Sequence, residues 1–176
     1  FGLIGIATFF ITVTNVLVEG GFGAALINKK NTTQTDYSTI FFINIGFSVF
    51  LYLLLYVSSA GIASFFGNPP IQPLLKLLGL NIVLVSFELI HRTILIKELA
   101  FRKIAVVSLI SVTISAVCAI VMAKRGWGVY SLVYRVLIGE AITVALFWIL
   151  NKWRPSWLFS WQSFKQLFLY GGNLLF

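Results

Sequence analysis

Charged residues are scarce in this sequence, and their scarcity decides the class of protein. They make up 10% of the 176 residues, hydrophobic residues make up 59%, and the mean hydropathy is +0.97. Soluble domains carry about 25% charged residues, so this chain has too few charges to cover a water-soluble core of its length. The composition excludes an ordinary soluble domain and indicates that lipid surrounds most of the protein.

Cysteine and histidine each occur once, as Cys118 and His91. They can form neither a disulfide framework nor a metal cluster. The chain also lacks a glycine-rich phosphate loop, a His-Glu-x-x-His motif, a Cys-x-x-Cys pair and a serine elbow. We therefore expect no enzyme, no metal and no cofactor. An intramembrane glycan transferase or ligase stays open as an alternative, because its catalytic loop could lie outside this stretch of sequence.

Basic residues outnumber acidic ones by 13 to 5 and give the chain a formal net charge of +8. Such an excess can indicate nucleic-acid binding, but these residues lie between apolar runs and not in a dense basic stretch beside exposed aromatic residues. We therefore expect no nucleic-acid partner and attribute the charge to membrane topology.

Several apolar stretches are long enough to cross a membrane, which takes about 20 mostly apolar residues in a helix. They are continuously apolar, unlike the alternating segments of about 10 residues in a β-barrel. The sequence therefore predicts an all-α integral membrane protein, with a polytopic transmembrane bundle over residues 1–155. The five predicted helices cover about residues 1–27, 39–66, 73–96, 104–123 and 128–150.

The segment after the fifth predicted helix has a different pattern. Residues 156–168 place Trp157, Trp161, Phe164 and Phe168 at helical spacing with polar residues between them, which is typical of an amphipathic helix lying at a membrane surface. It could be an anchor or a lever that couples two halves of a transporter. A sixth apolar run starts at about residue 166 and continues to Phe176. We expect a fragment of a longer protein, with residues 166–176 as the start of a truncated helix.

Basic residues in the loops are distributed unevenly. The first, third and fifth loops hold eight lysines and arginines, whereas the second and fourth loops hold only Lys124 and Arg125. Because short cytoplasmic loops retain basic residues, we expect the odd-numbered loops and the amphipathic helix on the cytoplasmic side.

Three of the predicted helices carry a stripe of polar or small residues on one face. Such a stripe can be a packing interface, where small side chains let helices approach, or one wall of a polar central cavity. The sequence leaves both interpretations open. The stripes are Gly5, Thr8, Thr12, Asn15 and Glu19; Asn44, Ser48, Tyr52 and Tyr56; and Ser108, Ser111, Ser115 and Cys118.

Ionisable residues inside the predicted helices are the sharpest candidates for function. Glu88 and Arg92 are four residues apart and are expected to form an ion pair. His91 lies beside them and is a candidate for a substrate or proton role. Arg135 and Glu140 are five residues apart, about 140° around the helix. They should not pair with each other, and each needs a partner elsewhere.

Five short motifs give the sequence a family resemblance. They are Glu19–Ile27 followed by Lys29-Lys30, then Phe65-Phe66-Gly67, Leu99–Arg102, Gly126–Val133 and Trp153-Arg154-Pro155. In this order the chain resembles polysaccharide-export flippases of the Wzx type, in the multidrug/oligosaccharidyl-lipid/polysaccharide exporter superfamily. The resemblance implies a multi-pass protein of the bacterial inner membrane with two helical lobes, of which this chain would supply the N-terminal lobe.

The resemblance also implies a function. Such proteins move undecaprenyl-pyrophosphate-linked oligosaccharide across the membrane by alternating access, and the resemblance implies membrane lipid and polysaccharide-assembly proteins as partners. A drug or cation exporter of the same superfamily, or a membrane packing module without transport, are the alternatives. The candidate substrate-binding residues are Arg135, Arg92, His91, Asn15 and Asn44, and the candidate ion-coupling residues are Glu19, Glu140 and Glu88.

Overall fold

A computed structural model describes residues 2–19, 21–165 and 167–168 of the chain. These residues form helices and connecting segments and no strand, which confirms the all-α prediction. Four of the helices, α3 to α6, are long and apolar enough to cross a membrane. The elements are α1 (Gly2–Glu19), α2 (Phe22–Asn28), α3 (Gln34–Phe65), α4 (Ile71–Lys97), α5 (Phe101–Lys124) and α6 (Tyr130–Leu150).

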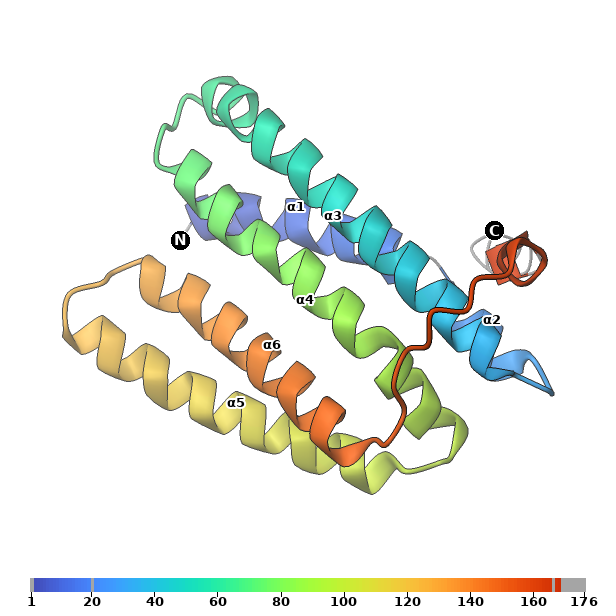
Figure 1. The fold of residues 1–176 in the computed structure, drawn as a ribbon. Helices are drawn as coiled ribbons and strands as arrows, with labels where there is room; N and C mark the ends of the chain where they lie inside the picture. The colour runs from blue at the N-terminus through green and yellow to red at the C-terminus, as the bar shows by residue number, and fades with distance from the viewer. Residues whose placement is uncertain (1, 20, 166, 169–176) are drawn as a thin grey trace.

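Helix α4 is the centre of the bundle. It packs against α3 on one side and α6 on the other, α1 lies across it, and α5 packs mainly against α6 (Figure 1). Its most apolar stretch is 61% buried, compared with 28% or less in the other three membrane-crossing helices. Helix α4 therefore contributes more buried side chains to the core than any other helix described, whereas α3, α5 and α6 turn much of their apolar surface outward.

The first predicted helix, residues 1–27, is divided in the structure. Helix α1 ends at Glu19 and α2 begins at Phe22. Gly21 between them has a φ of 71°, a left-handed conformation that glycine adopts without the steric cost of a Cβ atom. Gly21 thus lets the chain start a second helix at Phe22.

The start of α3 is fixed by side chains. Thr33 and Asp36 cap each other's backbone N–H groups in a capping box, which satisfies donors that the first turn of a helix leaves free. Asp36 also accepts a hydrogen bond from Lys29 at 2.8 Å. The Lys97 ammonium, at the end of α4, donates to the carbonyl oxygens of Leu26 and Lys29. The loops that end α2 and α4 are therefore held together at one end of the bundle.

The loops divide between the two ends as the alternation of helices requires. The connections at 29–33, 98–100 and 151–160 gather at one end, and the turns at 66–70 and 125–129 lie at the other (Figure 1). The basic residues of the odd-numbered loops thus share one end of the molecule. Their assignment to the cytoplasm stays a prediction.

The segment after α6 differs from the amphipathic helix predicted at 156–168. Residues 151–160 are not helical, and the helical residues of this segment are 161–165 and 167–168. Pro155 disfavours a helical conformation for the residue before it, and Ser160 caps the following turn by accepting from the N–H of Ser163 at 3.2 Å. The predicted start of a sixth helix lies outside the described residues at 166 and 169–176.

Candidate functional site

The polar stripe of α3 lies in a packing interface with α4. The hydroxyl of Ser48 donates to that of Ser86 at 3.0 Å. One turn further along, Gly79 lets the ring of Tyr52 approach so closely that a Cβ atom on Gly79 would lie 2.9 Å from Tyr52 Cδ2. For this stripe the structure favours the packing interpretation over the cavity.

Asn44 begins that stripe and is fully buried. Neither atom of its side-chain amide has a hydrogen-bond partner in the part of the chain that the structure describes. As a candidate for substrate binding, Asn44 therefore sits inside the bundle and not on an open surface.

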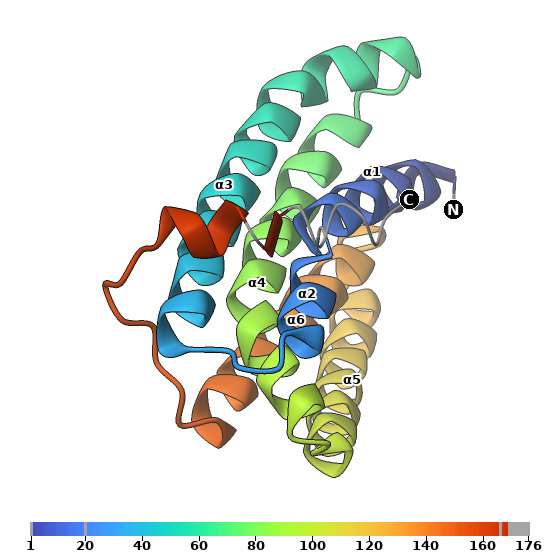
Figure 2. The ribbon, with the colours of Figure 1, turned by 90° about the vertical axis from the view of Figure 1, so that its right-hand side faces the viewer.

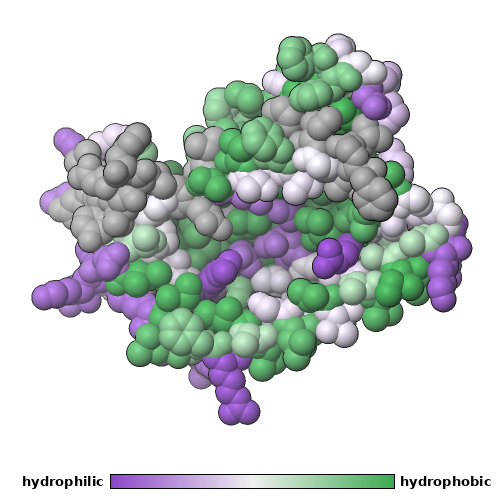
Figure 3. All heavy atoms as spheres, turned by 180° about the vertical axis from the view of Figure 1, so that it is seen from behind, coloured by the Kyte–Doolittle hydropathy of each residue, from purple (hydrophilic) through white to green (hydrophobic). Residues whose placement is uncertain are grey.

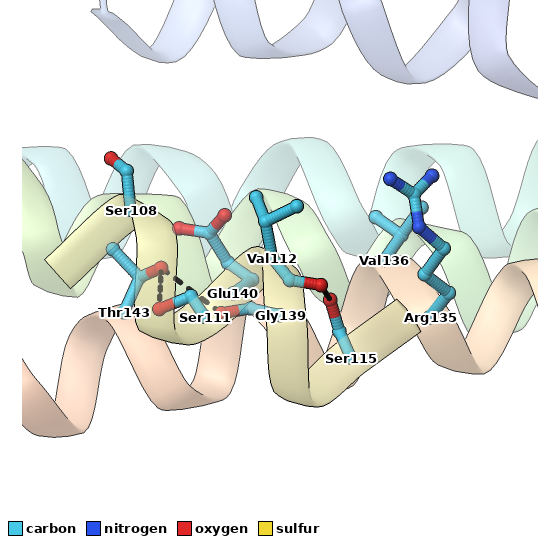
Figure 4. A pocket seen from close by; sticks show the side chains of 9 residues that line it. All are labelled: Ser108, Ser111, Val112, Ser115, Arg135, Val136, Gly139, Glu140 and Thr143. Carbon is cyan, nitrogen blue, oxygen red and sulfur yellow. Dashed lines mark hydrogen bonds between the residues drawn. The ribbon is translucent and has the colours of Figure 1, made fainter. Parts of the chain in front are cut away.

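The serine stripe of α5 behaves differently, because it both packs against α6 and borders a pocket. Ser111 accepts a hydrogen bond from Thr143 at 2.9 Å, and Ser115 lies against Gly139, where a Cβ would be 3.2 Å from the serine oxygen. The pocket between the two helices has a volume of about 260 Å³ (Figure 4). Its lining residues are Ser108, Ser111, Val112, Ser115, Arg135, Val136, Gly139, Glu140 and Thr143.

Arg135 and Glu140 line this same pocket, although they are five residues apart on α6. Figure 4 shows both side chains extending from α6 to the side of the pocket where Ser108 also points. Arg135 is exposed and takes part in neither of the two salt bridges found among the described residues. A guanidinium, a carboxyl group and several hydroxyls therefore border one opening between two apolar helices.

Glu88 and Arg92 form the expected ion pair, with Arg92 Nη1 lying 3.4 Å from Glu88 Oε1. The side chain of Glu88 is 9% exposed, whereas that of Arg92 is 51% exposed, so the pair leaves the guanidinium accessible. Arg92 also lines a second cavity of about 320 Å³. The other residues of that cavity are Gly21, Gly23, Ala24, Ile27, Leu89, Thr93 and Ile96.

His91 is fully buried and lines neither of these cavities. Its ring lies 4.7 Å from the ring of Trp148 and 5.3 Å from that of Trp153, measured between centroids. Asn151 donates to its backbone carbonyl at 3.5 Å. The structure thus places His91 in an aromatic cluster that joins α4, the end of α6 and the segment after it.

The candidates on α1 are only partly described. Thr8 and Thr12 are exposed and Asn15 is half-buried, while Ile11 and Val18 pack into the core with α4. Glu19 ends the helix, and its side chain lies outside what the structure describes.

Seen from behind, the molecule has a hollow where hydrophilic surface gathers between hydrophobic surfaces above and below it (Figure 3).

Sequence reasoning missed Gly139 and Thr143, which complete the pocket from the α6 side. They are four residues apart and so share a face of α6 with each other and with Arg135. This small-and-polar spacing was the available signal. Sequence reasoning also missed Asn81, which is 4% exposed near the middle of α4. The signal available there was a single amide side chain within a run of leucines and isoleucine.

The whole chain, residues 1–176, matches the model of a family described as polysaccharide biosynthesis protein. The chain belongs to this family. The motif resemblance to Wzx-type flippases is thus confirmed at the level of the family, and the four membrane-crossing helices make this a multi-pass membrane protein.

Curated relatives carry similar descriptions. The chain is 25% identical over 167 residues to the succinoglycan biosynthesis transport protein ExoT of Rhizobium meliloti. This match covers 95% of this chain and 34% of the relative. It is 27% identical over 158 residues to the teichuronic acid biosynthesis protein TuaB of Bacillus subtilis, with 89% and 33% covered. It is 24% identical over 176 residues to the lipopolysaccharide biosynthesis protein WzxC of Escherichia coli, with 99% and 36% covered.

These matches show how much of each relative's length the chain corresponds to. It spans about a third of the length of the curated relatives. No solved structure matches the chain. The family and the membrane helices are therefore established, and the activity of the whole protein is a matter for proposal.

Proposed function

We propose that this chain forms one wall of the transport path in an exporter of lipid-linked oligosaccharide. The whole protein would move an undecaprenyl-pyrophosphate-linked repeat unit across the bacterial inner membrane by alternating access, without covalent chemistry on the sugar. Support comes from the family, from relatives whose names include a transport protein of polysaccharide biosynthesis, and from the pocket between α5 and α6.

The observation that carries the proposal is the position of this pocket along the two helices. Ser111 and Glu140 are the eleventh residues of α5 and α6, close to the middle of helices of 24 and 21 residues. Polar and ionisable groups at that depth are costly in lipid, and they usually face a water-filled path or a partner helix. Hydroxyls beside ionisable groups at mid-membrane suit a ligand rich in sugar hydroxyls.

Arg135 is our candidate for the group that binds the pyrophosphate. A guanidinium offers a planar fork of N–H donors that matches phosphate oxygens, and such charge-assisted hydrogen bonds are roughly twice as strong as neutral ones. Arg92 is a weaker candidate, because Glu88 already offsets its charge. Glu140, on the same pocket as Arg135, is our first candidate for ion coupling.

The test is polysaccharide export by variants of the full-length protein at matched expression. We expect export to fall in the order wild type, Arg135→Lys, Arg135→Gln, because lysine keeps the charge and loses the fork. If binding loses one charge-assisted contact, the drop for Arg135→Gln should be about 10-fold or more. Arg125→Gln is the matched control, since Arg125 is exposed in the turn before α6 and its loss should leave export unchanged.

A second variant separates substrate binding from simple charge balance. If Arg135 only offsets Glu140, the double neutralisation Arg135→Gln with Glu140→Gln should restore export. Restoration would overturn the binding role of Arg135. Continued loss of export in the double variant, with normal amounts of protein in the membrane, would support it.

A further inference from the structure

The segment that leaves α6 is held tightly against the start of α3. We call residues 151–165 the strap; Figure 2 shows it running from the end of α6 to the side of α3. Gln34 donates to the carbonyl of Arg154 at 2.7 Å and accepts from the indole N–H of Trp153 at 2.8 Å. The backbone N–H of Ser156 donates to Ser38 at 3.0 Å. Side chains of α3 therefore satisfy backbone groups in residues 151–160, the part of the strap that is not helical.

The position of the strap along α3 sets its depth in the membrane. Helix α3 has 32 residues and a length of about 48 Å, against a hydrocarbon core of about 30 Å. If it is centred, about six residues at each end lie outside the hydrocarbon. The strap contacts α3 from Gln34 to Phe42, where the sequence changes from polar to apolar at Ile40. With α3 centred in this way, the strap lies at the boundary between headgroups and hydrocarbon.

Its outward face combines aromatic rings with positive charge. Trp157 is 94% exposed although one side of its ring stacks on Phe42 at 5.2 Å, and Trp161 is 67% exposed. Lys152 and Lys165 are exposed on the same segment. The nearby Asp36 is buried and paired with Lys29, so it does not offset these two lysines at the surface.

We propose that the strap is a binding surface for anionic phospholipid headgroups. Tryptophan rings suit the interfacial layer, where one edge stays hydrated, and lysines beside them attract a negatively charged leaflet. The packing on α3 already orders the backbone of the strap, so binding a headgroup requires little further loss of conformational freedom. This inference goes beyond the transport function and does not depend on the substrate.

The experiment measures quenching of tryptophan fluorescence by brominated lipids. The full-length protein is placed in nanodiscs in which either phosphatidylglycerol or phosphatidylcholine carries the bromine, in the same mixture of the two lipids. Brominated phosphatidylglycerol should quench more strongly, and Trp157→Phe with Trp161→Phe should remove that difference. The paired variant Lys152→Gln with Lys165→Gln should weaken the preference by about 5-fold for each lysine lost.

The matched control removes the same charge from the opposite end. Lys124→Gln with Arg125→Gln alters two exposed basic residues, one at the end of α5 and one in the turn that follows it, and should leave the preference unchanged. Equal quenching by the two brominated lipids would mean that the strap is only an apolar anchor and would overturn the proposal. So would the absence of quenching by either lipid, because it would mean that protein covers the strap.

Discussion

The two antiparallel helix pairs of this chain, α3 with α4 and α5 with α6, have similar residues in their interfaces, but one interface is closed and the other borders a pocket. Both carry serines at helical spacing that meet a hydroxyl across the interface, Ser48 with Ser86 in one pair and Ser111 with Thr143 in the other. In the first pair the polar atoms are sealed, and in the second they border a pocket. A polar stripe therefore predicts close approach of helices, and its neighbours decide whether the stripe becomes a cavity wall.

The residues beside each hydroxyl pair explain the difference. Next to Ser48 and Ser86, the ring of Tyr52 fills the space over Gly79, and one turn further along α3 the ammonium of Lys76 lies 4.3 Å from the centroid of the Tyr56 ring. Next to Ser111 and Thr143, none of the described residues that line the pocket is aromatic, and Arg135 and Glu140 border it. Large rings seal one interface, and long charged side chains leave the other open.

The largest expected effect comes from breaking the sealed interface. Gly79→Val should lower the stability of the full-length protein in detergent by about 1–3 kcal/mol or more, because a Cβ would meet Tyr52 at 2.9 Å and Leu55 at 3.3 Å. Thermal unfolding followed by fluorescence measures it. Gly61→Val on the exposed side of α3 is the control, since nothing lies within 4 Å of a Cβ there. Equal losses in the two variants would contradict the seal.

A smaller effect should distinguish the two hydroxyl pairs. A double-mutant cycle with Ser48→Ala and Ser86→Ala should give a coupling free energy of about 0.6 kcal/mol, the average for such bonds between membrane helices. The cycle with Ser111→Ala and Thr143→Val should give a value close to zero, because water in the pocket can replace the lost partner. Equal coupling in both cycles would show that the pocket holds no water.

The smallest structural change is the replacement of one serine by a cysteine, whose reaction with a thiol reagent reports whether that position is accessible to water. In a background where Cys118 is replaced by serine, Ser108→Cys should react with a small charged thiol reagent added to the purified full-length protein. Ser48→Cys should not react, because Ser108 is exposed at the pocket whereas Ser48 is fully buried. If the cysteine at position 108 did not react and the cysteine at position 48 did, the assignment of the open and the closed interface would be reversed.

Particular residues show how far the sequence could go toward the candidate site. The spacing of Glu88 and Arg92 predicted their ion pair correctly, because two residues four apart on one helix are neighbours whatever surrounds them. The same reasoning could not say that Arg135 and Glu140 share a pocket, since the space between them depends on α5. It could not place His91 in an aromatic cage either, because Trp148 and Trp153 are more than fifty residues away in the chain.

The fold of the chain also depends partly on the sequence alone and partly on tertiary contacts. The sequence by itself determined that the chain is a helical membrane protein, because apolar runs of this length leave the backbone no other way to satisfy its hydrogen bonds in lipid. Its motifs also indicated the family. Only the tertiary structure decided that residues 151–160 of the strap lie against α3, because the side chains that hold them there are those of Gln34, Ser38 and Thr39. It also decided which polar stripe is sealed and which is open, since the side chains that fill an interface come from a different helix.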